Sequence, residues 1–136
     1  MDSQDAIERP QLVLTISSEV LAICQLPRDT TLPEWVTTAD FYSVTRTEHE
    51  LSVICPERQV PADVKSEGGW RALYSEGPLG FTLTGLLESL AEPLAVACVS
   101  IFVISTFTTD YLMVKQDDLD IAVLALQGAG HRVRQG

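Results

Sequence analysis

The spacing of apolar residues from Trp70 to Gln135 constrains the fold more than any other feature of this 136-residue sequence. A strand pattern at residues 70–76 precedes the turn "GPLG" and a helix pattern in which apolar residues recur every three or four positions. Two strand patterns, "VSIFVIST" and "DYLMVK", come next, followed by the helix pattern "DDLDIAVLALQGAG" and the strand pattern "HRVRQ". The order strand, helix, strand, strand, helix, strand predicts a ferredoxin-like unit, an antiparallel sheet with helices on one face.

Both predicted helices carry start or stop signals. Thr82 is a suitable N-cap for the first helix. Pro93 lies inside the apolar pattern of that helix, so it should remove one backbone hydrogen bond and bend the helix near residues 89–93. The second helix is expected to end at Gly128 or Gly130.

The first half of the chain repeats this scheme loosely. Residues 1–9 are predicted to form a flexible polar tail, and "LVLTISSEVLAICQL" predicts two strands that meet near two serines. One helical turn is expected at residues 33–37, then a hairpin from "FYSVTRT" and "ELSVICPE". With "QVPADVKSEGG" as the expected boundary, we predict an α+β chain with a first module at residues 10–68 and a second at 69–136.

Charge and hydropathy exclude two classes of partner. Nine Lys and Arg residues face nineteen Asp and Glu residues, the formal net charge is −10, and the basic residues are scattered, so binding to nucleic acid or to an anionic membrane is not expected. The longest apolar runs fall far short of the roughly 20 residues of a membrane-spanning helix. The N-terminus lacks the pattern of a secretory or transit peptide, so a cytoplasmic location is expected.

Cysteines and histidines show no spacing typical of a reactive site. Cys24, Cys55 and Cys98 each lie in an apolar segment without a CxxC pair, which predicts reduced core thiols. His49 and His131 are isolated, and no nucleophile and base pattern or phosphate-binding loop is present. The sequence therefore predicts no catalytic residue, no metal, no cofactor and no enzymatic activity.

Several segments, in the right order, carry a resemblance to a known family. The stretch "EGPLGFTLTGLLESLAEPLAVACVSIFVISTFTTDYLMVK" resembles the ACT domain, a small ligand-binding module attached to amino-acid biosynthetic enzymes. The segment "FYSVTRTEHELSVICPE" is similar to the matching strand pair of a first ACT module. The chain most resembles the tandem-ACT group that includes stand-alone bacterial proteins and the CASTOR arginine sensors.

This resemblance implies two ferredoxin-like ACT modules in tandem, associated as a homodimer, that bind a free amino acid between modules without chemical change. It also implies a regulated protein partner. The positions that match the ligand site are Gly80, Phe81, Thr82, Leu83, Thr84, Gly85 and Leu86 at the turn and helix start, Thr106, Phe107 and Asp110 at the strand and hairpin, and Ser43 and Val44 in the first module.

The chemistry of these positions suits a zwitterion. The unpaired N–H groups of a helix start attract a carboxylate, and glycines such as Gly85 allow close approach of the backbone. Asp110, with Thr106, can accept hydrogen bonds from an ammonium group. Each residue also has a simpler interpretation, because Asp110 suits a hairpin turn and Thr106 suits a strand.

The identity of the ligand is narrowed by one departure from the family pattern. The arginine sensors have an acid where this chain has Leu83, so arginine is a poor candidate. Walls formed by Leu83, Val44 and Phe107 favour a neutral or apolar amino acid. The alternative function is a protein interaction or oligomerisation module whose ligand pocket has degenerated.

Overall fold

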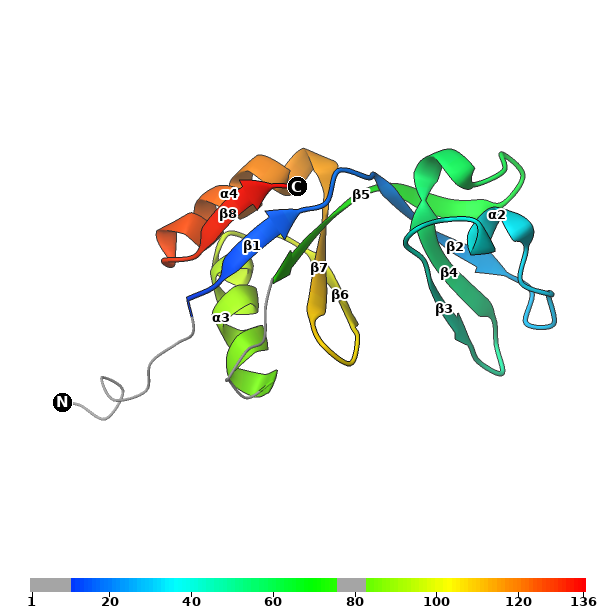
Figure 1. Cartoon of the computed structure of the whole chain (residues 1–136), viewed down its shortest axis with the longest axis horizontal. Coiled ribbons are helices and arrows are strands. Elements are labelled where there is room, and N and C mark those ends of the chain that lie inside the picture. Colours follow the sequence, from blue (N-terminus) through cyan, green and yellow to red (C-terminus); the bar gives the residue numbers. More distant parts are fainter. Residues whose placement is uncertain (1–10, 76–82) are drawn as a thin grey trace.

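In the computed structural model, one mixed sheet of eight strands joins two halves of the chain (Figure 1). The structure describes residues 11–75 and 83–136, and for residues 83–87 it describes the backbone alone. In chain order the elements are β1 (Val13–Ile16), β2 (Leu21–Leu26), α2 (Glu34–Thr37), β3 (Ser43–Arg46), β4 (Leu51–Pro56), η1 (Glu57–Gln59), β5 (Lys65–Ser75), α3 (Leu83–Val96), β6 (Ile101–Ser105), β7 (Asp110–Lys115), η2 (Gln116–Asp118), α4 (Leu119–Gly128) and β8 (Arg132–Gln135).

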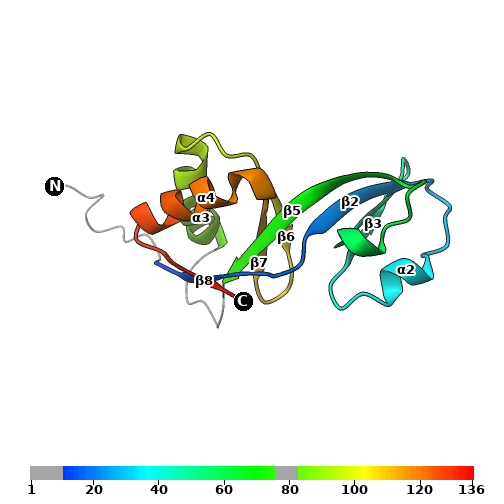
Figure 2. The same ribbon diagram turned by 90° about the horizontal axis from the view of Figure 1, so that it is seen from above.

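The eleven-residue strand β5 is common to both halves. Its first part pairs antiparallel with β2, and the other side of β2 pairs with β4 of the β3–β4 hairpin. Its second part lies between β1 and β7, and the open side of β7 pairs with β6. Strands β1 and β2 therefore run along β5 one after the other, and Figures 1 and 2 show them beside it through the middle of the molecule.

The α+β class with two ferredoxin-like halves is confirmed, and so is the predicted order of elements after Trp70. The structure differs from the prediction in two details. Strand β5 begins at Lys65, inside the segment expected to separate the modules, and β1 pairs in parallel with β8, so the sheet is mixed rather than wholly antiparallel. The division of the chain between residues 68 and 69 stays a prediction.

Helices cover the sheet because their apolar stripes match its buried side chains. Leu90 and Leu94 of α3 pack with Leu126 of α4 against the C-terminal half of the sheet. Figure 2 shows both helices on one side of that half. In the N-terminal half, the short helix α2 contributes Val36 to a separate core with residues of β2 and β4.

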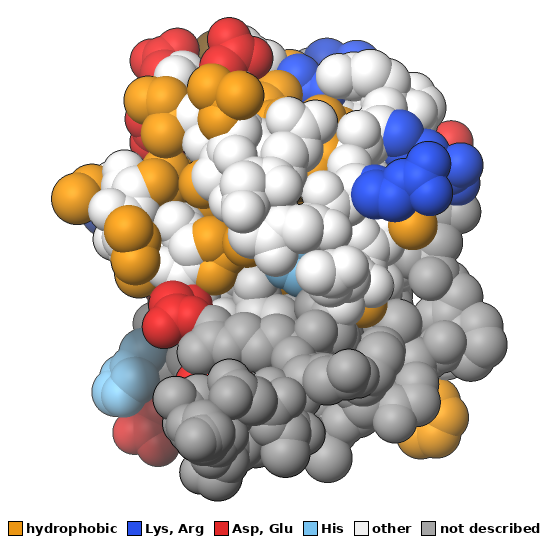
Figure 3. Space-filling view, turned by 90° about the vertical axis from the view of Figure 1, so that its left-hand side faces the viewer, with side chains coloured by type: hydrophobic (Ala, Val, Ile, Leu, Met, Phe, Trp, Pro, Cys, Tyr) orange, Lys and Arg blue, Asp and Glu red, His pale blue; other side chains and the backbone are white. Residues whose placement is uncertain are grey.

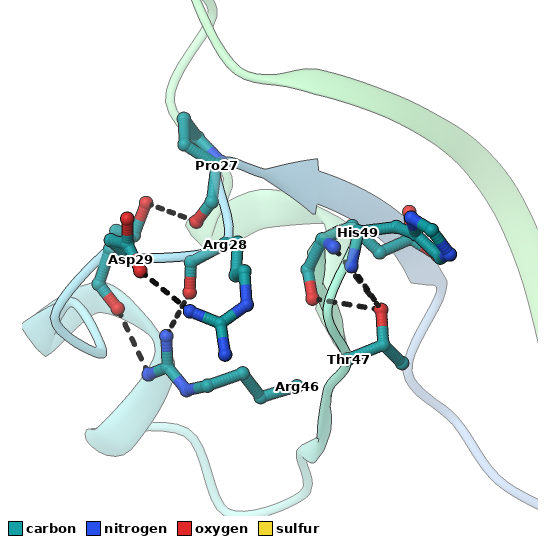
Figure 4. A network of polar contacts seen from close by, with 8 residues as sticks. Pro27, Arg28, Asp29, Arg46, Thr47 and His49 are labelled. Carbon is teal, nitrogen blue, oxygen red and sulfur yellow. Dashed lines mark hydrogen bonds and ion pairs between the residues drawn. The ribbon is translucent and has the colours of Figure 1, made fainter.

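A network of polar contacts connects the loop after β2 with the β3–β4 hairpin (Figure 4). The Arg46 guanidinium donates hydrogen bonds to the backbone oxygens of Arg28 and Thr30, the second at 3.0 Å. The Thr47 hydroxyl accepts from the backbone N–H of His49 at 3.0 Å, inside the β3–β4 turn. These contacts tie the loop after β2 to the hairpin and fix the position of β3.

The three cysteines do not share one environment. Cys24 and Cys55 are buried, as predicted, whereas Cys98 is exposed, so the prediction of a core thiol at Cys98 is wrong. Cys98 lies in the turn after α3 with a φ of 61°, a conformation that ends the helix and turns the chain toward β6. Burial raises the pKa of the Cys55 thiol to about 12, and the neighbouring Cys24 adds to the shift.

Among residues 11–75 and 83–136, no helix is both long and apolar enough to cross a bilayer. Within the same ranges, no three His, Cys, Asp or Glu side chains gather in an arrangement that could hold a metal ion.

Candidate ligand-binding site between the halves

A cavity of about 310 Å³ lies between the β3–β4 hairpin and strand β6. One wall consists of Ser43, Thr45, Ser52 and Ile54 from the hairpin. The other wall is the run of residues 102–105 on β6. The cavity therefore joins the two halves of the molecule, in the volume range of small-molecule sites.

The hairpin wall is one face of the two strands. Ser43 lies opposite Ile54 and Thr45 lies opposite Ser52 in the antiparallel register, so all four side chains are on the same face. Three of these four carry hydroxyl groups. This wall can donate and accept hydrogen bonds but has no formal charge.

The β6 wall is an edge of the sheet rather than a face, because consecutive residues line it and β6 pairs only with β7 among the described strands. At the hairpin turn, the Thr106 N–H donates to the Thr109 carbonyl at 2.8 Å. Hydrogen-bonded and non-bonded pairs alternate along an antiparallel ladder, so Ser105 and Val103 occupy non-bonded positions. Their backbone N–H and C=O groups point away from β7, along the free edge.

A second cavity, of about 690 Å³, adjoins the first and shares Ser52 and Phe102 with it. Its lining includes the charged side chains of Glu50, Lys65 and Glu67. Phe102 lines both cavities, and the centroid of its ring lies 6.2 Å from that of Trp70 at an interplanar angle of 60°. The cleft between the halves thus has a chamber lined by hydroxyl groups and a charged chamber.

Lys115 of β7 binds to β5 next to this cleft. Its ammonium donates to the Gly68 carbonyl at 2.8 Å, pairs with the Glu67 carboxylate at 2.9 Å and lies 4.9 Å from the centroid of the Trp70 ring. Gly69, with a φ of 79°, sits where β5 passes from one half to the other. A residue other than glycine would be strained in that conformation.

The predicted residues of the β6–β7 hairpin lie beside the cleft in different roles. The Ser105 hydroxyl donates to the Asp110 carboxylate at 2.6 Å. The Thr106 hydroxyl bonds within the turn, where it accepts from the Thr109 N–H at 3.1 Å. Phe107 is fully exposed at the tip, so the structure places its ring outside both cavities.

The remaining predicted residues fall into two groups. Ser43 lines the smaller cavity, whereas Val44 projects from the opposite face of β3 and is exposed. Gly80, Phe81 and Thr82 lie outside the described residues, and Leu83, Thr84, Gly85 and Leu86 form the first turn of α3, where only the backbone is described.

Sequence reasoning missed most of the cavity lining, namely Thr45, Ser52, Ile54, Phe102, Val103, Ile104 and Ser105. One signal was available on the hairpin. Ser43 and Thr45 are spaced by two on a strand, which puts both hydroxyls on one face. The approach of β6 had no local signal, because it depends on how β5 joins the halves.

Comparison with known proteins identifies the family. A family model described as the ACT domain matches residues 65–128, and a model of an N-terminal domain matches residues 19–63. The chain belongs to the ACT-domain family. The resemblance carried by the sequence motifs is thereby confirmed.

The curated relatives of this ACT-domain protein include an arginine sensor. The mouse (Mus musculus) cytosolic arginine sensor for mTORC1 subunit 1 is 30% identical over 109 residues, which are 74% of this chain and 31% of the sensor. The chain therefore spans about a third of the length of the curated relatives it matches.

Solved structures share the fold over most of the chain. A protein from Agobacterium tumefaciens is 35% identical with a TM-score of 0.88, covering 93% of this chain and 95% of that one. The ligand-free regulatory subunit of aspartate kinase from Thermus thermophilus has a TM-score of 0.57 at 9% identity, over 82% of this chain and 93% of that one. The second likeness concerns the fold alone. The ACT-domain chain is thus similar to part of an arginine sensor and shares its fold with a kinase regulatory subunit.

Proposed function

We propose that this ACT-domain chain is a cytoplasmic regulatory protein that binds a free amino acid in the cleft between its halves. The ligand is bound without chemical change, and occupancy alters the affinity of the protein for a partner. The observation that carries the proposal is the cavity between the hydroxyl face of the β3–β4 hairpin and the free edge of β6.

A zwitterion matches the groups around this cavity. Its carboxylate requires N–H or O–H donors and its ammonium requires carbonyl or carboxylate acceptors, a few ångströms apart. The free edge of β6 supplies both kinds of backbone group at Val103 and Ser105, and Asp110 adds a carboxylate next to Ser105. We assign Asp110 to the ammonium group in addition to its contact with Ser105.

Related proteins support a regulatory role rather than catalysis. The mouse relative is an arginine sensor, and the Thermus protein is the regulatory subunit of a kinase. We do not carry arginine over to this chain, for two reasons. The family pattern expected from the sequence has an acid where this chain has Leu83, and the chain spans only part of the arginine sensors. A neutral amino acid is the proposed ligand class.

Regulation requires that the ligand bind one arrangement of the halves more tightly than another. The two walls of the cavity belong to different halves, which are joined through β5 and the Lys115 contacts. A ligand that contacts both walls would favour the arrangement in which the two halves lie close together. A partner that binds this arrangement more tightly would then bind the protein according to whether the cleft is occupied.

The test is a thermal melt of the purified, ligand-free protein with each of the twenty amino acids at millimolar concentration. A ligand at one hundred times its Kd stabilises the folded state by about 2.7 kcal/mol, which raises the midpoint by roughly 10 °C in a domain of this size. At least one amino acid should produce such a shift. Twenty unchanged midpoints from a folded sample would reject amino-acid binding.

A second candidate function is assembly, because a helical surface exposes apolar side chains. Val96 of α3 and Ile121 and Leu124 of α4 are 80%, 51% and 68% exposed. Figure 3 views the end of the molecule where these helices lie and shows hydrophobic side chains gathered on it. Such a patch is typical of an interaction surface. A homodimer through this surface would be detected by light scattering and would be weakened by Leu124→Asp.

A further inference from the structure

We infer that the chamber lined by hydroxyl groups selects a small amino acid with a neutral, hydrogen-bonding side chain, and that Thr45 and Ser43 determine this specificity. The inference rests on the proposed function, since it assigns a ligand class to the same cleft. This ligand class differs from the neutral or apolar class expected from the sequence, because Val44 and Phe107, two of the expected apolar walls, lie away from the cavity.

The free edge of β6 sets the orientation of the ligand. Val103 and Ser105 turn their backbone N–H and C=O groups out from the free edge of β6. A free amino acid carries the complementary groups on adjacent atoms, as an added strand does along a sheet edge. The main chain of the ligand therefore lies along β6, and its side chain points across the cavity to the hairpin.

The side chain of the ligand meets the wall formed by the β3–β4 hairpin. Ser43, Thr45 and Ser52 present three hydroxyls there, and Ile54 is the apolar member of the wall. An apolar side chain would cover these hydroxyls without offering a hydrogen bond, which leaves polar groups unsatisfied. A hydroxyl or amide side chain can donate and accept at once, which suits the wall.

Charged ligand side chains do not suit this chamber. Among the described residues its lining has no Asp, Glu, Lys, Arg or His, and the Asp110 carboxylate beside the lining is assigned to the ammonium group, so an ionised side chain would lose hydration without gaining a counter-charge. The acids of the neighbouring chamber already have partners. Glu67 pairs with Lys115 at 2.9 Å, and Glu50 accepts from the Gln25 amide at 2.9 Å.

The volume sets the final limit. The chamber measures about 310 Å³, at the lower end of the range for small-molecule sites. Phe102 lines both this chamber and the charged one, and its ring packs against Trp70. Serine, threonine, asparagine and glutamine are the amino acids that satisfy charge, polarity and size together.

The experiment compares these four amino acids with L-valine, L-leucine, L-arginine and L-aspartate by isothermal titration calorimetry. L-Threonine and L-valine form the sharpest pair, since they have nearly the same shape and differ by a hydroxyl in place of a methyl group. At least one of the four neutral polar amino acids should bind about tenfold or more tightly than every apolar or charged one. Binding of only apolar or charged amino acids would overturn this inference and leave the proposed function standing.

Two variants test the residues. Thr45→Val and Ser43→Ala each remove one hydroxyl from the wall and should weaken the best polar ligand about threefold to tenfold. The matched control is Thr31→Val, because Thr31 is an exposed loop residue outside both cavities, and it should leave the affinity unchanged. Normal melting curves would show that the variants are folded. Full affinity in both wall variants would overturn the assignment of the chamber, and no binding by any amino acid to the folded wild type would reject it together with the proposed function.

Discussion

His131 donates a hydrogen bond of 2.8 Å from Nε2 to the backbone carbonyl of Ser89, the group that would accept from residue 93 in a regular helix. Residue 93 is proline and has no N–H to give. The other ring nitrogen, Nδ1, accepts from the Leu12 N–H at 3.0 Å, so the proton of the neutral ring is on Nε2. One buried imidazole thus links α3 to the start of β1.

His131→Ala should lower the free energy of unfolding by about 2–4 kcal/mol. The substitution leaves the buried Leu12 N–H without its acceptor and removes the donor to Ser89, and each such loss costs about 1–3 kcal/mol. Urea denaturation followed by circular dichroism measures the change. His49→Ala is the control, since His49 is an exposed turn residue and should change stability by less than about 0.5 kcal/mol. Equal effects of the two substitutions would contradict the linking role.

Pro93→Ala should make the His131 hydrogen bond partly redundant. Alanine restores an N–H to the helix, and this N–H competes for the Ser89 carbonyl. A double-mutant cycle with His131→Ala should therefore give a coupling energy of about 1 kcal/mol, with His131→Ala costing less in the Pro93→Ala background. Additive effects would show that the proline and the histidine are independent.

Asp110→Ala should weaken amino-acid binding at least about tenfold if the carboxylate meets the ammonium group of the ligand. Asp117→Ala provides the matched control, because Asp117 is an exposed acid outside both cavities. Asp110→Ala also removes the 2.6 Å hydrogen bond from Ser105 and should lose about 1 kcal/mol of stability, whereas Asp117→Ala should leave the affinity unchanged. Calorimetric binding by Asp110→Ala at the wild-type affinity would leave Asp110 with a turn role alone.

Lys115→Met should lower the free energy of unfolding by about 1–2 kcal/mol. The change removes the bond to the Gly68 carbonyl, the ion pair with Glu67 and the contact with Trp70, while keeping an unbranched side chain. Glu67→Gln removes the ion pair alone and should cost less than about 1 kcal/mol, an effect that shrinks at high salt. If Lys115→Met costs no more than Glu67→Gln in urea denaturation, the other two contacts contribute nothing.

The buried thiol of Cys55 should make the protein less stable at alkaline pH. Its pKa of about 12 lies above the ordinary value of about 8.5, so the folded state holds the proton more tightly than the unfolded state. The resulting stabilisation is complete below about pH 8.5 and is lost as the pH rises toward 12. Between pH 8 and 10, the stability of wild type relative to Cys55→Ala should fall by about 1.5–2 kcal/mol.

Cys98→Ser is the control for this pH dependence, since Cys98 is exposed. Its stability relative to wild type should stay constant over the same range, because the substitution leaves the buried Cys55 thiol in place. Parallel pH profiles for Cys55→Ala and wild type would contradict the effect of burial.

The α+β class, the order of the elements and the family could all be predicted from the sequence. Each rests on local information: alternation along "FYSVTRT" and "ELSVICPE", the apolar stripe that brings Leu90 and Leu94 to one face of α3, and the motifs from "EGPLGF" to "DYLMVK". Such patterns report which face of an element is buried, and this is decided within about ten residues.

The way in which the halves share β5, and therefore the lining of the cleft, depends on long-range pairing in the folded chain. The run "VKSEGG" contains two glycines and few β-formers, yet it pairs with β2 because the same strand continues into the second half. That pairing brings the hydroxyl face of Ser43 and Thr45 to the free edge of β6. Contacts between residues sixty positions apart leave no periodicity in the sequence, so the lining of the cleft could not be predicted from it.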